Sequence, residues 1–455
     1  MFRRSFLRTL GAGAAAGTVL GAVRPAAAAA GPSSSEGVLN PVVAGLDLRD
    51  VDVVDSHMHP LIRSPISAAY DKQAKGFSEA FAQPGDFPGR AELLAKMKEG
   101  FAEGIWDQPR RIGYFNYVAR TYGVPATLEG FDSVVVKHIG SDADFTAYIA
   151  SILDREKIRT VVLQSEEPDP KVPPKTAIPP DRFVWTWPFA QTFLPSWAAK
   201  NHTTTLQDVV ALLDRTLENA VASGCRGFKN VSAYYRPYDL AHVTKSEAEA
   251  ALKALLAATP VRMNTWDVPV YDKPALNAAL KTYQDYLFKH VYVRAGELER
   301  PIIIHSAVAL HPSLRPDYNN PLPLYDVFRD ADIQKAGTRF VLIHAGYPSY
   351  QIVAAMIGQF PNVYTDVSFY SKYPGVLEET YRALLALAPS EKIMHGSDAN
   401  TVPEEIGYCC WNSRAVLARV LSDYKTYYGW TAEDTTKAAN NVLHGTARKI
   451  FRISG

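Results

Sequence analysis

Histidine or aspartate side chains stand at the ends of several short apolar stretches of this chain. His57 and His59 end the stretch VDVVDSHMHP, His305 ends PIIIHS, His344 ends FVLIHA and Asp398 ends KIMHGSD. Neutral imidazole nitrogens and one carboxylate oxygen are donors that a borderline-soft divalent metal prefers, and an open coordination position leaves room for water. These five residues are therefore candidate ligands for one or two divalent ions, with zinc as the first expectation and manganese or iron as alternatives.

The elements that would position these side chains are short β-branched segments separated by amphipathic ones. Apolar runs such as PIIIH and FVLIH are typical of strands that are buried on both faces. Strands are predicted at residues 51–57, 159–165, 183–189, 225–231, 301–306, 340–345, 362–367 and 392–398. Eight strand–helix units with right-handed crossovers predict a closed (β/α)8 barrel, the TIM-barrel fold of the α/β class.

A barrel of this kind would bring the candidate ligands together. Successive side chains of a strand alternate between its two faces, so His57 and His59 can point the same way. The carboxyl ends of the strands lie at one end of the barrel, where the active sites of this fold are found. Because every candidate ligand stands at such an end, residues far apart in the sequence should meet in one pocket.

Two stretches are longer than a minimal barrel needs. Residues 60–157 follow the first strand and contain helical patterns such as SDADFTAYIASILDREK, which predicts a mostly helical insertion over the barrel mouth. Residues 233–300 form a second long connection. Long connections at the carboxyl ends of barrel strands commonly shape access for the substrate.

The amino-terminal residues have the layout of a cleavable export signal. Arg3, Arg4 and Arg8 precede an Ala/Gly-rich apolar stretch with a small-residue end. RRSFLRTLG looks like a twin-arginine signal, and the apolar run is too short and too rich in glycine for a stable membrane anchor. We therefore expect an exported protein, periplasmic or secreted after cleavage. The predicted organisation is an export signal at residues 1–30, a linker at 31–50 and the barrel at 51–455.

Composition limits the class of partner. The 455-residue chain is 47% hydrophobic and has a formal net charge of +1, which allows a large core and gives no overall field suited to nucleic acid or anionic membranes. Its three cysteines are too few for a disulfide framework. A small-molecule substrate is the expected partner, and assembly into a homo-oligomer through aromatic residues of the insertion stays open.

Several motifs resemble those of a known superfamily. VDVVDSHMHP, RFVLIHAGYP, PNVYTDVS, KIMHGSDA and NNVLHGTARKIF look like the amidohydrolase superfamily, in particular its amidohydrolase-2 (decarboxylase-like) branch. GCRGFKNVSAYYR, HAGYP and SDANTVPEE are similar to the amidohydrolase module of FluG/nodulin-type proteins. The resemblance implies a metal held by His57 and His59, with His305 and Asp398 completing or adjoining the site and His344 as a ligand or an acid/base.

Lys229 stands at the end of the predicted fourth strand and has two alternative roles. Many binuclear members of the superfamily that the chain resembles place a carbamylated lysine there, and it bridges two metals. In the other interpretation the ammonium group binds a substrate carboxylate, together with Tyr234 and with Arg236, whose guanidinium can hold a carboxylate through two hydrogen bonds. The sequence leaves both roles open.

Together with the candidate ligands, the resemblance implies a metal-dependent enzyme that cleaves an amide or related C–N bond of a small, carboxylated substrate. A bound divalent ion lowers the pKa of its water from about 15.7 to about 7. Asp398 would take the water proton and return it to the leaving nitrogen, His344 would stabilise the oxyanion or relay that proton, and Asp55 would orient a ligand imidazole. Non-oxidative decarboxylation on almost the same ligands is the alternative function, and the complete ligand set argues against a non-catalytic binding protein.

Overall fold

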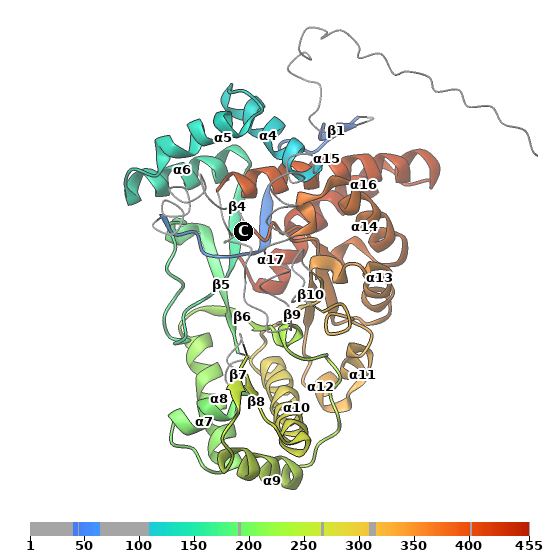
Figure 1. Cartoon of the computed structure of the whole chain (residues 1–455). Helices are drawn as coiled ribbons and strands as arrows, with labels where there is room; N and C mark the ends of the chain where they lie inside the picture. The colour runs from blue at the N-terminus through green and yellow to red at the C-terminus, as the bar shows by residue number, and fades with distance from the viewer. Residues whose placement is uncertain are drawn as a thin grey trace, which may run out of the picture. The chain divides into compact units, whose positions relative to one another are not determined.

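One sheet of eight parallel strands forms the centre of the computed structural model (Figure 1). In chain order the strands are β3 (Val53–Met58), β4 (Ile158–Gln164), β5 (Phe183–Pro188), β6 (Cys225–Asn230), β9 (Ile302–His305), β10 (Phe340–Ile343), β11 (Val363–Asp366) and β12 (Ile393–Met394). Each strand overlaps a segment predicted from its apolar, β-branched pattern. The predicted (β/α)8 barrel is therefore confirmed.

Backbone hydrogen bonds bring the two edges of this sheet together. The ladder runs β12-β11-β10-β9-β6-β5-β4-β3, so β3 and β12 are its ends. The N–H of Ser56 in β3 donates to the carbonyl of His395 at 2.9 Å, and the N–H of Asp398 donates to the carbonyl of His57 at 2.8 Å. The segment that follows β12 thus lies against β3 and closes the barrel, and this closure brings the first and last candidate ligands side by side.

The structure describes residues 40–43, 45–63, 109–189, 193–264, 268–308, 315–400 and 403–454. The predicted export signal, part of the predicted linker and residues 64–108 of the predicted insertion lie outside these ranges. Within them, none of the helices is long and apolar enough to cross a membrane.

Helices follow most of the strands and surround the sheet (Figure 1). They are α7 (Pro195–Lys200), α8 (Leu206–Ala222), α11 (Leu324–Arg329), α12 (Ala331–Lys335), α13 (Tyr350–Gln359), α14 (Pro374–Leu387), α15 (Glu404–Tyr427), α16 (Ala432–Asn440) and α17 (Thr446–Phe451). α8 shows why such segments are helical: the Thr205 hydroxyl caps its first turn, and Leu206, Val209, Leu213 and Leu217 recur at helical spacing and are buried.

The last helix packs against the strands. Ala447, Ile450 and Phe451 of α17 form a buried cluster with one or two apolar side chains from each of several strands, including Val54 of β3 and Met394 of β12. The strands are buried on both faces, as their continuous apolar runs predicted. This packing holds the strands whose carboxyl ends carry the site.

The described part of the predicted insertion is helical. It contains α4 (Pro109–Tyr122), α5 (Leu128–Val135) and α6 (Asp142–Arg155). In α4, the rings of Tyr114 and Tyr117 lie 5.5 and 6.0 Å from the ring of Tyr408 in α15. The placement of the insertion over the barrel mouth stays a prediction.

The connection between β6 and β9 is mostly helical as well. It holds α9 (Lys245–Leu256), a small antiparallel pair of β7 (Arg262–Met263) and β8 (Pro269–Val270), and α10 (Pro274–Glu297). α9 begins with a reciprocal capping box between Thr244 and Glu247. At the other end of the described chain, β1 (Val42–Val43) and β2 (Leu46–Asp47) form a short antiparallel pair.

Candidate metal centre

Three side chains from the two ends of the closed sheet converge on one point. The Nε2 atoms of His57 and His59 lie 3.2 and 3.5 Å from the same oxygen of Asp398, Oδ1. One ligand atom from each of these residues lies within 4.8 Å of the other two. The spacing H-x-H places both imidazoles on the same side of the chain at the end of β3, as alternation predicts.

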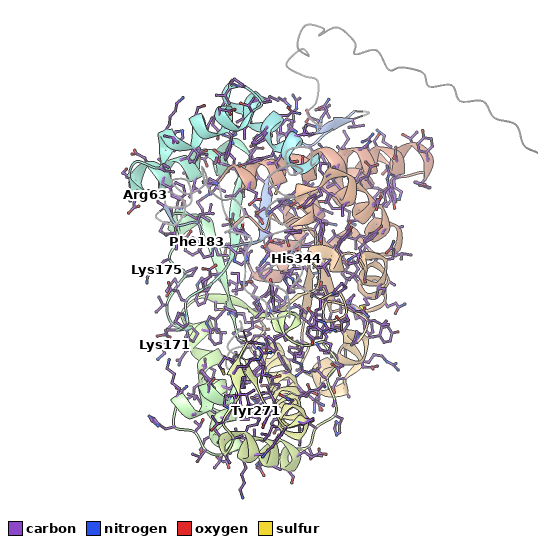
Figure 2. The ribbon with its side chains drawn as sticks, in the orientation of Figure 1. Arg63, Lys171, Lys175, Phe183, Tyr271 and His344 are labelled. Atoms are coloured by element: carbon purple, nitrogen blue, oxygen red, sulfur yellow. The ribbon has the colours of Figure 1, made fainter. Side chains whose placement is uncertain are left out.

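His305 and His344 lie beside this group. His344 Nε2 is 3.2 Å from His305 Nδ1, and the centroids of the His57 and His344 rings are 5.4 Å apart. Tyr234 places its hydroxyl oxygen 3.3 Å from His305 Nδ1. Figure 2 shows His344 near the middle of the view, among the strands. The structure thus brings together the four histidines that the sequence singled out and places Asp398 among them.

The register of the strands places Lys229 on the same face of the sheet as His305. Lys229 pairs with Ile303, which is two residues before His305 on β9. Its side chain is buried, and none of the described residues forms an ion pair with it. Burial lowers the pKa of Lys229 to about 7, against the raising effect of the Asp398 and Asp366 carboxylates. Both the neutral amine and the ammonium are therefore populated near neutral pH, so carbamylation and carboxylate binding both stay open.

Hydrogen bonds on the outer sides of three rings define their inner nitrogens. His305 Nε2 donates to a backbone carbonyl two residues along the chain at 2.9 Å, and His59 Nδ1 donates to the Glu166 carboxylate at 3.4 Å. His344 Nδ1 lies 3.2 Å from the carbonyl oxygen of Ser368, which can only accept. With these nitrogens protonated, the opposite nitrogens of the neutral His305 and His344 rings carry lone pairs that face the interior.

The lone pairs of His305 and His344 face each other at short range. His344 Nε2 lies 3.2 Å from His305 Nδ1. Two acceptors at such distances repel each other unless a proton or a cation lies between them. Imidazole nitrogens whose outer N–H groups are fixed by carbonyl or carboxylate partners are the usual ligands of divalent metals. The residues present therefore fit a divalent ion.

Burial keeps three of the imidazoles neutral. It lowers the pKa of His57 and His305 to about 3, with a smaller lowering from the positive charge of Lys229. It also places the pKa of His344 well below the usual value. Neutral imidazole is the form that binds a metal.

His59 and Asp398 behave differently because they pair with each other. Burial opposes the charged form of His59, yet hydrogen bonds to Asp398 and Glu166 outweigh it and raise the pKa of His59 to about 9. Burial would likewise raise the pKa of Asp398, but hydrogen bonds from His57 and His59 hold it well below its usual range. Asp398 is therefore ionised, as a metal ligand or a general base must be.

Two of these residues have an uncommon backbone conformation. His344 and Asp398 have φ of 65° and 54°, in the left-handed region. Such conformations cost on the order of 1–3 kcal/mol each and concentrate at functional sites. The N–H of His344 donates to the Asp366 carboxylate at 2.8 Å, and that of Asp398 donates to the His57 carbonyl. These hydrogen bonds hold both side chains at the carboxyl end of the barrel.

A family model described as amidohydrolase matches residues 205–453, more than half of the chain. This chain belongs to the amidohydrolase family. The amidohydrolase is 24% identical over 233 residues to the protein fluG of Emericella nidulans, and the match covers 50% of this chain and 26% of fluG. The chain therefore spans about a quarter of the length of that curated relative.

Two solved structures share the fold of this amidohydrolase. A Lactobacillus casei protein described as a metal-dependent hydrolase has a TM-score of 0.64 at 18% identity, covering 89% of this chain and 96% of that one. The uronate isomerase of Thermotoga maritima has a TM-score of 0.59 at 14% identity, covering 89% of this chain and 95% of that one. At these identities the likeness shows the fold alone.

Arg236 of the amidohydrolase does not join the cluster. Its guanidinium forms an ion pair with Asp285 of α10 and donates to the side chain of Gln284 at 3.3 Å and to the carbonyl of Asp239 at 3.0 Å. Its Nε donates to the carbonyl of Pro237 at 3.3 Å. Each nitrogen of the Arg236 guanidinium already has a protein acceptor. We therefore do not propose that Arg236 binds a substrate carboxylate. Tyr234, in contrast, does reach the site.

Asp55 differs from its predicted role. Its Oδ1 accepts backbone N–H groups of His57 and Ser397 at 3.2 and 2.9 Å. Asp55 therefore joins β3 to the segment that follows β12, and among the described residues no imidazole forms a hydrogen bond with it. The prediction that Asp55 orients a ligand imidazole through such a bond is wrong.

Three other residues of the site did not appear in the sequence interpretation. Glu166 follows β4 and holds His59, while Asp366 and Ser368 stand at and just after the end of β11 and hold His344. All of them stand at or just after the carboxyl end of a strand, so the rule that found the histidines also applies to them. A search for any polar side chain at these strand ends, and not for metal donors alone, would have found them.

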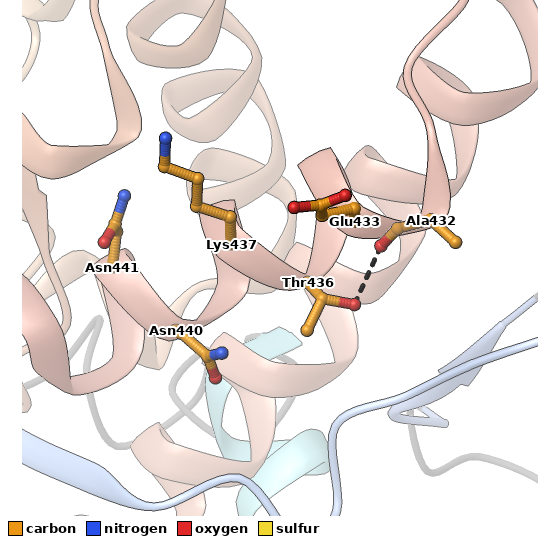
Figure 3. Close-up of a pocket in the computed structure, with 6 residues that line it drawn as sticks. All are labelled: Ala432, Glu433, Thr436, Lys437, Asn440 and Asn441. Atoms are coloured by element: carbon orange, nitrogen blue, oxygen red, sulfur yellow. Dashed lines mark hydrogen bonds between the residues drawn. The ribbon is translucent and has the colours of Figure 1, made fainter.

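A separate hollow lies on the surface of α16 and the start of the short helix η9 (Asn441–Gly445) (Figure 3). It is lined by Ala432, Glu433, Thr436, Lys437, Asn440 and Asn441. None of these is a residue of the histidine cluster, and the hollow combines single charges of opposite sign. We assign the chemistry to the cluster at the ends of the strands.

Proposed function

We propose that this amidohydrolase uses a divalent metal to hydrolyse an amide or related C–N bond of a small, carboxylated molecule. The observation that supports the proposal most is the arrangement of four imidazoles around the ionised Asp398, with the interior lone pairs of His305 and His344 facing each other. Family membership supports an enzyme of a metal-dependent superfamily. The type of bond that is cleaved and the class of substrate are proposed in addition to this family membership.

The residues would divide the chemistry among them. His57 and His59, with Asp398 adjoining, would hold the ion, and zinc is the metal that best matches these donors. When bound, a divalent ion supplies a water of lowered pKa and polarises the carbonyl oxygen. Asp398 would take a proton from the attacking water and deliver it to the leaving nitrogen, which requires the ionised carboxylate found here.

Tyr234 would act on the oxygen of the scissile carbonyl, and its hydroxyl lies beside His305 Nδ1. His344 would adjoin the ion as a ligand, because its interior nitrogen, Nε2, carries a lone pair and has no proton to donate to that oxygen. A hydroxyl donor placed near the developing oxyanion would stabilise it. Lys229 would either bridge two ions as a carbamate or bind the substrate carboxylate, and metal stoichiometry separates these roles: two ions per chain support the bridge, and one supports the anchor.

Product analysis tests the proposed reaction. Purified protein loaded with zinc would be incubated with a panel of amides of carboxylated molecules, γ-glutamyl amides among them, and with carboxylated aromatic compounds. We expect release of ammonia or an amine from at least one amide and no such release from an Asp398→Asn variant. Release of carbon dioxide without any amine would contradict the proposal and would support the alternative of non-oxidative decarboxylation.

We also propose that the protein is exported through a twin-arginine signal in residues 1–30. The support is the sequence pattern alone: paired Arg3 and Arg4 ahead of an apolar stretch with a small-residue end. Replacing both arginines by lysine should retain the uncleaved protein inside the cell. Fractionation with antibody detection measures this, and unchanged export would contradict the proposal.

A further inference from the structure

The end of β11 carries a buried carboxylate that gathers four donors. Asp366 Oδ1 accepts the backbone N–H of His344 at 2.8 Å, the backbone N–H of Ser368 at 3.0 Å and the Ser368 hydroxyl at 2.6 Å. Asp366 Oδ2 accepts the Ser56 hydroxyl at 3.0 Å. Asp366, Ser368 and Ser56 are all buried. Three strands, β3, β10 and β11, are thus joined behind the cluster.

The direction of these hydrogen bonds fixes the proton on His344. Ser368 has one hydroxyl proton, which it donates to Asp366, so its oxygen is left to accept. His344 Nδ1 lies 2.8 Å from that hydroxyl oxygen and 3.2 Å from the carbonyl oxygen of the same serine. Both oxygens require a hydrogen on Nδ1. A neutral His344 then carries its lone pair on Nε2, the nitrogen that faces His305.

Gly396 makes room for this arrangement. A Cβ atom at that position would lie 2.8 Å from the Cβ of Ser368, 3.0 Å from the Ser56 hydroxyl oxygen and 3.3 Å from Asp366 Oδ2. Any side chain there would push the serines away from the carboxylate. Close packing against Ser368, Ser56 and Asp366 therefore explains why the motif HGSD has a glycine at this position.

We infer that Ser368 and Asp366 are positioning residues that hold His344 in the Nδ1–H tautomer and so turn its Nε2 lone pair toward the metal centre. The inference rests on the proposed metal site, which gives that lone pair its use. Outer partners of metal-binding histidines commonly change metal affinity about 10- to 100-fold when they are removed. Ser368 acts through His344 and needs no contact with the substrate.

The first measurement reads the tautomer directly in the metal-free protein. Histidine labelled with 15N distinguishes protonated from unprotonated ring nitrogens by NMR, and a His344→Gln variant assigns the signals. We expect Nδ1–H in the wild type and a shift of population toward Nε2–H in Ser368→Ala. We expect Ser368→Thr, which keeps the hydroxyl, to retain the wild-type tautomer.

The second measurement is zinc affinity by competition with a chelator. Ser368→Ala should bind zinc about 10- to 100-fold more weakly, and Ser368→Thr should bind close to the wild type. If Ser368→Ala fails to fold, Ser368→Cys fills the same volume with a weaker acceptor and should show the same direction of change in both measurements. Failure of the wild type to bind zinc would count against the metal site itself. The tautomer of His344, in contrast, tests only the hydrogen bonds among Asp366, Ser368 and His344.

Ser413→Ala is the matched control. Ser413 of α15 is equally buried and its hydroxyl lies 2.8 Å from Nδ1 of His395, a histidine outside the cluster. We expect this variant to alter the His395 signal and to leave the His344 tautomer and zinc affinity unchanged. The inference would be overturned if Ser368→Ala kept the Nδ1–H tautomer, or if Ser368→Thr lost zinc affinity as severely as Ser368→Ala.

Discussion

Asp398 is the residue on which the proposed chemistry depends. It is ionised, buried, held in a left-handed backbone conformation and placed against two imidazoles. Of its two neighbours, His57 is buried and His59 is half-buried, so its charge is compensated mainly by specific groups. A carboxylate in this setting can accept a proton only from a molecule bound in the same space.

Replacing Asp398 by asparagine should abolish turnover while the barrel stays folded. The amide keeps the size of the side chain but cannot accept a proton, and general acid–base groups typically contribute about 10²- to 10⁴-fold to the rate. Turnover and far-ultraviolet circular dichroism of the variant check this. Asp214→Asn, at an aspartate that hydrogen-bonds His290 on the outer helices, should keep full activity. Equal turnover of Asp398→Asn and the wild type would remove Asp398 from the chemistry.

At the scale of elements, a buried lysine links the segments around Asp398. Lys372, in the short helix η7 (Tyr370–Lys372) after β11, donates to the carbonyl of Asp398 at 2.9 Å and pairs with Glu405 of α15 at 3.0 Å. Both side chains of this ion pair are buried. Lys372 therefore ties the loop after β12 to the first turn of α15.

Replacing Lys372 by methionine should destabilise the fold strongly. The change removes the cation of a buried ion pair, and breaking such a pair by removing one partner costs about 3–5 kcal/mol. Adding Glu405→Gln should recover part of the loss, because a neutral amide is buried at lower cost than a carboxylate. Urea unfolding of the single and double variants measures both effects. A single variant as stable as the wild type would show that the pair does not anchor this loop.

The strands and helices also show which features of the fold and the site could be predicted from the sequence. All eight strands were predictable because each lies in a short, largely apolar segment, and the clustered histidines were predictable because they stand at the ends of such segments. The ion-pair partner of Arg236 was not predictable. Asp285 lies 49 positions away on α10, and its distance from Arg236 depends on how that helix packs. The hydrogen bond between Ser368 and His344 likewise depends on the relation between β10 and β11, which sequence spacing does not give.

At the scale of the whole molecule, one buried acid makes stability depend on pH. Glu404, the first residue of α15, is fully buried, and no other residue in the described part of the chain forms a hydrogen bond with its carboxylate oxygens. Burial raises the pKa of Glu404 from its ordinary 4.5 to about 8. Between those values the folded protein keeps a proton that the unfolded chain releases. The free energy of unfolding therefore falls as pH rises through this window, by up to about 1.4 kcal/mol per pH unit from this group.

Replacing Glu404 by glutamine should flatten that dependence. The amide cannot ionise, so the variant should lose less stability than the wild type between pH 6 and pH 8. Urea unfolding at the two pH values measures the difference, and Glu433→Gln on exposed α16 should behave as the wild type does. An identical pH dependence in Glu404→Gln and the wild type would contradict the assignment of a raised pKa to Glu404.

The closed barrel brings five potential metal ligands to one place: His57, His59, His305, His344 and Asp398. The claim that they bind a divalent metal is tested most directly by measuring how many metal ions the protein holds. Elemental analysis would compare purified wild type with a His57→Ala/His59→Ala double variant after equal zinc loading and removal of free metal. We predict at least one equivalent of zinc in the wild type and at least one equivalent less in the double variant. Equal zinc content in the two proteins, or none in the wild type, would contradict the metal centre.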